Sequence, residues 1–367
     1  MSEIQISHTI SICSQYATVG YCNRSLQSQS SPKLSLYRSE RKTALSLRRL
    51  SCAHSYSTPP AFLTQAKIGL VTHPPELCEE GTGGTYFLKN QQNKPVAVFK
   101  PSNEDPLSLQ NPKRTTNNND FHFKGFLPGE GSQREIFAYL ADKKFAGVPE
   151  TIPAEISHWI FTDKNGSPGT VTSQLTTKQG SMQHFISDIQ CTVDDMGYGK
   201  FSLPDVQKIA ILDMLLVNCD RNGGNILVQK NSHKLVPIDH AFSLPDYRNV
   251  TDLCWFEWLT WRQVKQTVLP EVISFIEKYD IVEAILLATK LGIRKECLLT
   301  LQLSHVFLKR ALAKKLTLYE IARLMCTRDE NSPSVFAQLI TKASVSTSTS
   351  SSILPLFTQE VTKYFSQ

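Results

Sequence analysis

Two carboxylates and an amide stand at a spacing that suits phosphoryl transfer. Asn225 follows Asp220 by five residues, and Asp239 follows Asn225 by fourteen. Transfer of a phosphoryl group requires a carboxylate near the attacking hydroxyl and oxygen ligands for Mg²⁺. A loop from Asp220 to Asn225, and a hairpin that returns the chain to Asp239, can supply both. The loop 220–225 alone is better explained as a Gly-rich turn, and Asp239 alone as an aspartate that follows a strand. Together and in this order, the two features indicate a catalytic site.

A Gly-rich segment before a predicted strand could hold phosphates. Glycine lets backbone N–H groups approach an anion closely, and threonine hydroxyls add donors. Lys100 comes sixteen residues after Gly84, at the end of the strand-like run 96–99. An adjacent antiparallel strand would place this ammonium beneath the phosphates, although a turn and a solvent-facing lysine would be the simpler interpretation of either feature alone. The predicted phosphate-binding residues are Gly81, Thr82, Gly83, Gly84, Thr85 and Tyr86.

A third candidate is Glu135, near the beginning of a predicted helix over 134–144. A kinase-type lysine needs a carboxylate on a nearby helix to orient it. Glu135 belongs to the first helix expected after Lys100, and the apolar residues of that helix share one face. We therefore expect Glu135 to pair with Lys100, while an ordinary surface salt bridge would explain the neighbouring Arg134 equally well.

The elements that must position these residues are mainly strands in the first half of the folded region and mainly helices in the second half. Ser202 and Pro204 mark the beginning of a helix that continues to residue 217. The first half of the folded region is β-rich and the second half is helical, which indicates an α+β fold. The predicted strands are 86–88, 96–99, 171–175, 225–228 and 234–238, and the predicted helices are 134–144, 202–217, 281–290 and 317–326 within a mainly helical stretch from 267 to 340.

Composition divides the chain into four parts. Residues 1–61 are rich in serine and arginine and poor in acids, so we expect a disordered tail that cannot bury enough apolar surface to fold. A plastid transit peptide is the less favoured interpretation of this tail. Residues 62–187 are predicted to form an N-terminal lobe with the nucleotide loop, and residues 188–342 a C-terminal lobe with the catalytic and activation loops. A Ser/Thr run at 344–352 predicts that residues 343–367 are a linker and tail.

Charge, hydropathy and cysteine usage argue against several classes of protein. Residues 1–60 account for +5 of the net charge of +6, so the body is nearly neutral and nothing global points to nucleic acid. No run of roughly 18 apolar residues occurs, which predicts no membrane-spanning helix. Nine cysteines without a C-x-x-C pair argue against a disulfide framework and a structural zinc site, and they fit a reducing compartment.

Longer stretches resemble the catalytic domain of phosphatidylinositol 3- and 4-kinases, most closely the plant phosphatidylinositol 4-kinase gamma group. The resemblance covers roughly residues 62–340 and rests on many collinear motifs. It implies a two-lobed, protein-kinase-like fold with a β-rich N-lobe and a helical C-lobe. The matching stretches are EGTGGTYFL (80–88), VAVFKPSNEDP (96–106), PGEGSQREIFAYL (128–140), FAGVPET (145–151), DVQKIAILDMLLVNCDRNGGNIL (205–227), VPIDHAFSLP (236–245) and FEWLTW (256–261).

The resemblance also implies a nucleotide site. ATP would be bound by residues 81–86 and by Lys100, with Glu135 and Asp239 also near the nucleotide. The metal would be Mg²⁺, with Mn²⁺ as an alternative. The hinge that contacts adenine in this family is implied at Gln183, His184, Phe185 and Ile186.

For the chemical step, the resemblance implies Asp220 as the catalytic aspartate, in one loop with Arg221 and Asn225. Asn225 and Asp239 are implied as metal ligands. One departure from the family pattern is Asn222, where the group usually has His, and it could slow the chemistry without removing the base. A segment near the substrate is implied at Asn103, Glu104 and Asp105.

The favoured acceptor is the inositol 4-hydroxyl of phosphatidylinositol. An atypical Ser/Thr protein kinase is the alternative, because the fold accommodates both acceptors. A catalytically weak ATP-binding scaffold is less favoured, since the candidate catalytic and metal-binding residues are all present. The aromatic residues of 255–261, beside Arg262 and Lys265, could touch a membrane surface, although packing inside the C-lobe is favoured. We expect a cytoplasmic protein with a peripheral membrane surface as a second partner, and no nucleic acid.

Overall fold

The computed structural model describes residues 46–49, 59–114, 124–158, 160–161, 176–252, 255–327, 332–346 and 353–367. The described residues gather into two units. Unit 1 contains the residues up to Arg114 and Ile152–Ser187, and unit 2 contains Thr115–Thr151 and Asp188–Gln367. The prediction places residues 115–151 in the first lobe, whereas the structure places the described part of this stretch, 124–151, in unit 2.

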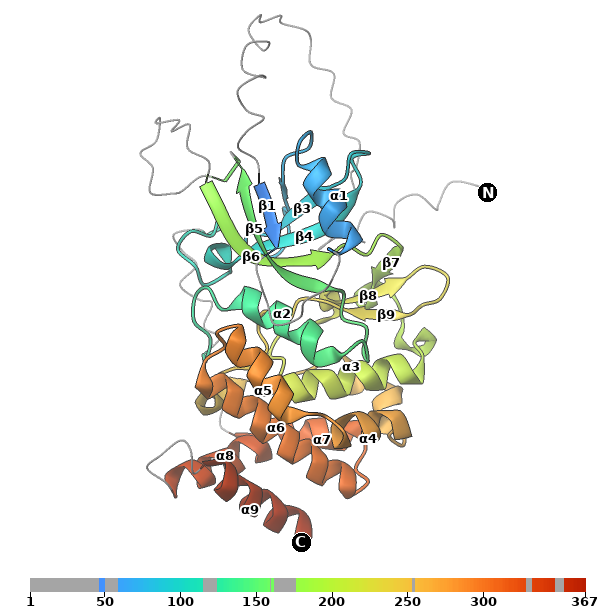
Figure 1. The fold of residues 1–367 in the computed structure, drawn as a ribbon. Coiled ribbons are helices and arrows are strands. Elements are labelled where there is room, and N and C mark those ends of the chain that lie inside the picture. Colours follow the sequence, from blue (N-terminus) through green and yellow to red (C-terminus); the bar gives the residue numbers. More distant parts are fainter. Residues whose placement is uncertain are drawn as a thin grey trace, which may run out of the picture. The chain divides into compact units, whose positions relative to one another are not determined.

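Unit 1 is built on a six-stranded sheet in the order β1-β5-β6-β4-β3-β2 (Figure 1). Strand β4 carries the buried run 96–99, which is typical of a strand covered on both faces. Helix α1 (Ala61–Gly69) packs on this sheet, because Phe62, Leu63 and Ala66 are buried in one cluster with residues of β3 and β4. The strands are β1 (Ser46–Arg49), β2 (Glu76–Leu77), β3 (Tyr86–Lys89), β4 (Pro95–Pro101), β5 (Thr151–His158) and β6 (Thr176–His184).

Two predictions for unit 1 can be compared with the sheet. The hairpin is confirmed, because β3 pairs antiparallel with β4 and Tyr86 lies opposite Phe99. The prediction of a wholly disordered tail is wrong at Ser46–Arg49, which pair antiparallel with β5. Pairing at a sheet edge uses backbone N–H and C=O groups, so a segment without an apolar pattern can still join a sheet. The other residues before 59 and the predicted strand at 171–175 lie outside the described residues.

Unit 2 combines helices with a three-stranded sheet in the order β7-β8-β9. Its strands are β7 (Ile189–Thr192), β8 (Ile226–Gln229) and β9 (Leu235–Pro237). The two predicted strands around residues 231–232 are confirmed as β8 and β9, and Asn231 adopts the positive φ that such a turn requires. The helices are α2 (Gly131–Asp142), α3 (Leu203–Leu216), α4 (Pro270–Glu277), α5 (Ile281–Lys290), α6 (Lys295–Ala313), α7 (Leu318–Met325), α8 (Val335–Val345) and α9 (Ile353–Ser366).

Helix α3 runs through the interior of unit 2 and is the predicted helix with the clearest boundary. Ser202 caps it, since the Asp205 N–H donates to Ser202 Oγ over 3.1 Å. The residues from Ile209 to Leu216 are all buried, including the polar Asp213. A helix that is buried on every side must lie within a core. Its last residue, Leu216, leads directly into the loop that carries Asp220.

The C-terminal region differs from its prediction as a linker and tail. Helix α8 extends to Val345, and α9 occupies most of the remaining residues. Ile353, Phe357 and Val361 of α9 are buried at helical spacing, so this helix docks one apolar face on unit 2. Phe307 of α6 meets aromatic rings from both α8 and α9. Among the described residues, no helix is both long and apolar enough to cross a bilayer.

We predict that unit 1 loses stability as the pH falls from about 6.5 to about 4, because of His158. Burial lowers the pKa of His158 from 6.5 to about 4, and its Nδ1 accepts a hydrogen bond from the Ile160 N–H over 3.1 Å. The unfolded chain therefore takes up a proton before the folded chain does. In His158→Asn, whose amide oxygen can replace Nδ1, the decline in the unfolding temperature over this pH window should be reduced. His73→Asn serves as the control, and identical pH profiles for all three proteins would contradict the assignment.

Candidate active site

The predicted phosphate-binding segment, residues 81–86, leads into strand β3. Gly81 has a φ of 72°, a left-handed conformation that glycine adopts at little cost. Side chains outside the segment hold its carbonyls: Asn111 Nδ2 donates to Thr82 O over 2.7 Å, and Lys113 Nζ donates to Gly81 O over 3.1 Å. The backbone of the segment is therefore anchored by side chains of unit 1.

Lys100 lies at the end of the hairpin where this segment enters β3. The ladder pairs Tyr86 with Phe99, and Lys100 follows on β4, opposite Ser181 of β6. Lys100 is half-buried. The register of the sheet thus brings the lysine to the same end as residues 81–86, as the sequence predicts, and its contact with phosphate stays a prediction.

Residues 183–186, the predicted adenine-contacting hinge, occupy the end of β6 and the two positions after it. The ring of His184 stacks on Phe62, with centroids 5.3 Å apart, and the ring of Phe185 meets Phe87 edge to face. The chain leaves unit 1 directly after these residues. Packing therefore fixes the backbone at this point, while its contact with adenine stays a prediction.

The segment Asn103 to Asp105 follows β4, and its first two residues belong to the 3₁₀ helix η3 (Ser102–Glu104). Asn103 and Asp105 each hydrogen-bond within the same loop. Glu104 is only 3% exposed, and its carboxylate is enclosed by residues of unit 1. This position does not fit a direct contact with a substrate. For Asn103 and Asp105, a role near the substrate stays a prediction.

Asp220, Arg221 and Asn225 lie together on the loop between α3 and β8, here called the catalytic loop (residues 218–225). Asn225 Nδ2 donates to the Asp220 carbonyl over 2.8 Å. The Asp220 N–H donates to Asn218 Oδ1 over 3.0 Å, and Asn222 Nδ2 donates to Asp220 Oδ1 over 3.1 Å. The loop thus gathers the predicted carboxylate and amide, and Asn222, the departure from the family pattern, contacts the carboxylate directly.

Arg221 is almost fully buried, with 1% of its surface exposed. Its Nε donates to both carboxylate oxygens of Asp213, each over 3.0 Å. Its Nη1 donates to Asn225 O over 2.6 Å and to Ile238 O over 2.7 Å, and its Nη2 lies 2.9 Å from His240 Nε2. A guanidinium engaged in this way does not reach a substrate, so Arg221 can serve catalysis only by positioning the chain around it.

Strand β9 brings Asp239 beside the catalytic loop. The Ile238 N–H donates to Asn225 O over 3.0 Å. Asp239 itself has a φ of 55°, a conformation that costs a non-glycine residue about 1 kcal/mol or more. The next N–H, that of His240, donates to Glu135 Oε2 over 3.1 Å. Glu135 therefore holds the segment that carries Asp239, and its pairing with the strand-end lysine of unit 1 stays a prediction.

The pair Asn225 and Asp239 fits the needs of a magnesium ion. Within the described ranges, no group of three or more His, Cys, Asp and Glu side chains is arranged to hold a metal. Mg²⁺ usually keeps several waters and takes one or two carboxylates together with substrate phosphates. Asn225 Nδ2 donates to the Asp220 carbonyl, and the atom of this side chain that suits a metal ion is the amide oxygen, Oδ1. One amide oxygen and one carboxylate are thus a sufficient protein contribution.

Two acidic residues against the catalytic loop are not predicted by the sequence analysis. A Cβ on Gly223 would lie 1.8 Å from Asp194 Oδ1, and the Glu257 N–H donates to Arg221 O over 2.9 Å. Burial and the nearby Asp195 raise the pKa of Asp194, and burial and Asp194 raise the pKa of Glu257. The available signal in the sequence is the glycine at position 223, since a glycine often marks a close approach of another group.

The aromatic segment 255–261 is mainly part of the interior. Phe256, Trp258 and Trp261 are buried, and Trp258 Nε1 donates to Asp213 Oδ2 over 2.9 Å. Trp255 is 47% exposed. The favoured interpretation of packing within the C-lobe is therefore confirmed for the buried members.

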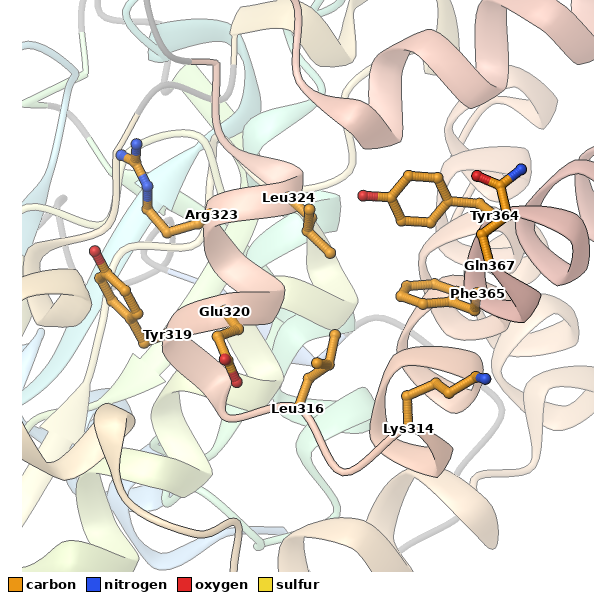
Figure 2. Close-up of a pocket in the computed structure, with 9 residues that line it drawn as sticks. All are labelled: Lys314, Leu316, Tyr319, Glu320, Arg323, Leu324, Tyr364, Phe365 and Gln367. Carbon is orange, nitrogen blue, oxygen red and sulfur yellow. The ribbon is translucent and has the colours of Figure 1, made fainter.

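A groove of about 740 Å³ lies between α7 and the end of α9 (Figure 2). Leu316 and Leu324 point toward Phe365 and Tyr364 across it (Figure 2). None of its lining residues is a predicted site residue, so the groove is separate from the residues assigned to chemistry. The lining residues are Lys314, Leu316, Tyr319, Glu320, Arg323, Leu324, Tyr364, Phe365 and Gln367.

Comparisons with known proteins show which family the chain resembles over the region that contains the candidate site. Residues 81–312 match the family described as phosphatidylinositol 3- and 4-kinase. Phosphatidylinositol 4-kinase gamma 2 of Arabidopsis thaliana is 34% identical over 291 residues, which are 74% of this chain and 52% of that protein. Phosphatidylinositol 4-kinase gamma 4 of Oryza sativa subsp. japonica is 33% identical, over 73% of this chain and 48% of that protein. The chain thus spans about half the length of these relatives.

We predict that Asp213→Asn lowers the free energy of unfolding of unit 2 by about 3–5 kcal/mol, the usual cost of breaking a buried ion pair from one side. The substitution leaves the guanidinium of Arg221 buried without its counter-charge. Denaturant unfolding followed by tryptophan fluorescence would measure the loss, since Trp255, Trp258 and Trp261 all belong to unit 2. Glu277→Gln, an exposed acid of the same unit, should change stability by less than about 0.5 kcal/mol. Equal effects of the two substitutions would refute the role of Asp213.

Proposed function

Because the chain belongs to the phosphatidylinositol 3- and 4-kinase family, which it matches over residues 81–312, we propose that it is a phosphatidylinositol 4-kinase. It would transfer the γ-phosphate of ATP to the inositol 4-hydroxyl of phosphatidylinositol. The observation that carries this proposal is the arrangement of Asp220, Asn225 and Asp239 around one buried arginine, in a chain whose relatives are named phosphatidylinositol 4-kinases.

Binding of ATP is assigned to unit 1. The anchored segment 81–86 would receive the phosphates on backbone N–H groups other than that of Gly84, which donates to the Glu104 carbonyl, and Lys100 at the end of β4 offers a positive charge. Residues 183–186 are assigned to the adenine. A lysine at a strand end that is half-buried keeps its charge near the phosphates instead of in bulk solvent, which supports this assignment.

The metal and the base are assigned to unit 2. Mg²⁺ bound with ATP would offset the negative charge that spreads over the transferred phosphoryl group. Asn225 Oδ1 and the Asp239 carboxylate would hold it, with Mn²⁺ as an alternative. The Asp220 carboxylate would take the proton of the attacking hydroxyl. The hydrogen bond from Asn222 Nδ2 to Asp220 Oδ1 orients this carboxylate.

We propose that the reaction takes place at a membrane surface, because phosphatidylinositol is a membrane lipid. Arg262 and Lys265 are exposed, as is Trp255 nearby in the sequence. Arg262 Nη2 donates to Gly199 O over 3.1 Å, and Lys265 Nζ lies 5.1 Å from the ring centre of Tyr319. These contacts hold both cations at the surface. We propose a cytoplasmic protein that binds anionic membranes peripherally.

Asp220→Asn should lower the rate of phosphoryl transfer by about 10²–10⁴-fold, because it removes the general base. Binding of ATP and the unfolding temperature should stay near those of the wild type, since Asn keeps the shape of the side chain. Turnover with radiolabelled ATP on phosphatidylinositol vesicles would measure the effect, with Glu277→Gln as the control that keeps full activity. Wild-type turnover in Asp220→Asn would remove this carboxylate from the mechanism.

The double charge reversal Arg262→Glu with Lys265→Glu should reduce activity on anionic vesicles. Each well-placed basic residue contributes about 1 kcal/mol to binding of an anionic surface, so we expect a loss of roughly tenfold or more in vesicle binding. The loss should shrink at high salt. Lys290→Glu with Lys295→Glu makes the same charge change elsewhere on unit 2 and serves as the control. Equal effects of the two pairs would show that net charge alone matters.

The acceptor itself is tested with the wild-type protein. Phosphatidylinositol vesicles, phosphatidylinositol in detergent and a generic protein substrate are incubated in parallel with radiolabelled ATP and Mg²⁺. Label in the lipid supports the proposal. Label in protein, or in the enzyme itself, without any in phosphatidylinositol would overturn it in favour of an atypical protein kinase.

A further inference from the structure

Glu104 is a buried acid that contacts the phosphate-binding segment by both its side chain and its backbone. Its Oε2 accepts a hydrogen bond from the Tyr86 hydroxyl over 2.8 Å. Its carbonyl accepts another from the Gly84 N–H over 2.7 Å. Burial, and then the Glu104 carboxylate, raise the pKa of Tyr86 above its ordinary value, so the phenol stays a neutral donor. Glu104 thus contacts the segment at Gly84, just before β3, and at Tyr86, the first residue of β3.

Gly84 shows how closely the carboxylate approaches the segment. A Cβ on this residue would lie 2.2 Å from Glu104 Oε2 and 2.7 Å from Glu104 Cβ. Real Cβ atoms do not approach another heavy atom so closely, so any other residue at position 84 would force the two apart. The glycine is therefore required by Glu104, in addition to any closeness to phosphate.

Lys178 of β6 supplies the charge that keeps Glu104 in this place. It is 1% exposed, and its Nζ lies 2.6 Å from Glu104 Oε1. The contact does not have the geometry of a hydrogen bond, so the interaction is an ion pair. Nζ also lies 5.9 Å from the centre of the Phe161 ring. A buried carboxylate without such a partner would be strongly disfavoured.

The loop that begins with Glu104 holds the other half of the segment as well. Asn111 donates to Thr82 O, and Lys113 donates to Gly81 O. We call Glu104, Lys178 and Asn111 the clasp. Asn111 bonds to Thr82, Glu104 bonds to Gly84 and Tyr86, and Lys178 holds Glu104 in place. All three belong to unit 1.

We infer that Glu104 is a positioning residue for ATP: with Lys178 and Asn111 it holds residues 81–86 in the conformation that receives the phosphates. This inference rests on the proposed nucleotide-binding function of that segment. A segment with three glycines loses much conformational entropy when it becomes ordered. The clasp orders the segment before ATP binds, so binding of ATP does not have to supply that free energy.

The decisive variant is Tyr86→Phe, because it removes one hydrogen bond to Glu104 and keeps both the ring and the ion pair. Glu104→Gln is the stronger variant, since it also removes the counter-charge of Lys178. We expect the KM for ATP to rise by roughly fivefold in Tyr86→Phe and by at least about tenfold in Glu104→Gln, with kcat changed by less than about twofold. Glu155→Gln is the matched control, because its carboxylate accepts from Gln179, the neighbour of Lys178, without touching the segment.

Hydrogen–deuterium exchange of the nucleotide-free protein gives a second measurement that does not depend on activity. The amides of residues 81–86 should exchange faster in Tyr86→Phe and Glu104→Gln than in the wild type and in Glu155→Gln, while exchange in β4 stays the same. Unchanged exchange and unchanged KM in Tyr86→Phe would overturn the clasp. If the wild type bound no ATP at all, the proposed function would fail, and the exchange data would still decide whether Glu104 orders the segment.

Discussion

The buried guanidinium of Arg221 joins the parts of unit 2 that carry its chemistry. Burying a guanidinium is costly unless its N–H groups find acceptors, and here they meet a carboxylate, two carbonyls and an imidazole. These acceptors come from α3, from the catalytic loop and from the residues that follow β9. The positions of Asp220 and Asp239 therefore depend on one side chain that touches neither a substrate nor solvent.

Unit 1 also has a buried ion pair beside a Gly-rich segment. Lys178 and Glu104 form a buried ion pair beside a Gly-rich loop, as Arg221 and Asp213 do in unit 2. A buried pair adds little net stability over an apolar pair of equal size, but removing one partner is costly because it leaves the other charge buried and uncompensated. In both units the glycines make a loop that can approach a ligand, and the ion pair limits the conformations that this loop can take.

The sequence predicts those features that depend on neighbours along the chain. The cap at Ser202, the hairpin that ends near Lys100 and the order of Asp220, Asn225 and Asp239 are all local patterns. The strand β1, the docking of α9 and the burial of Glu104 depend on partners far away in the sequence. An acid in a polar loop looks exposed until the strand with its lysine, more than seventy residues later, is in place.

The chain passes from unit 1 to unit 2 after Arg114, returns after Thr151 and leaves again after Ser187. On the ribosome, β4 can pair with β3 at once, but it is made well before β6, its neighbour on the other side, and α2 is made in between. Until β6 is made, one edge of the apolar strand β4 has no neighbouring strand, while α2 of unit 2 is already being made. After residue 101 has been made and before residue 176 has been made, this exposed edge of β4 makes the nascent chain a candidate for chaperone binding. The edge is covered by β6 in the folded protein.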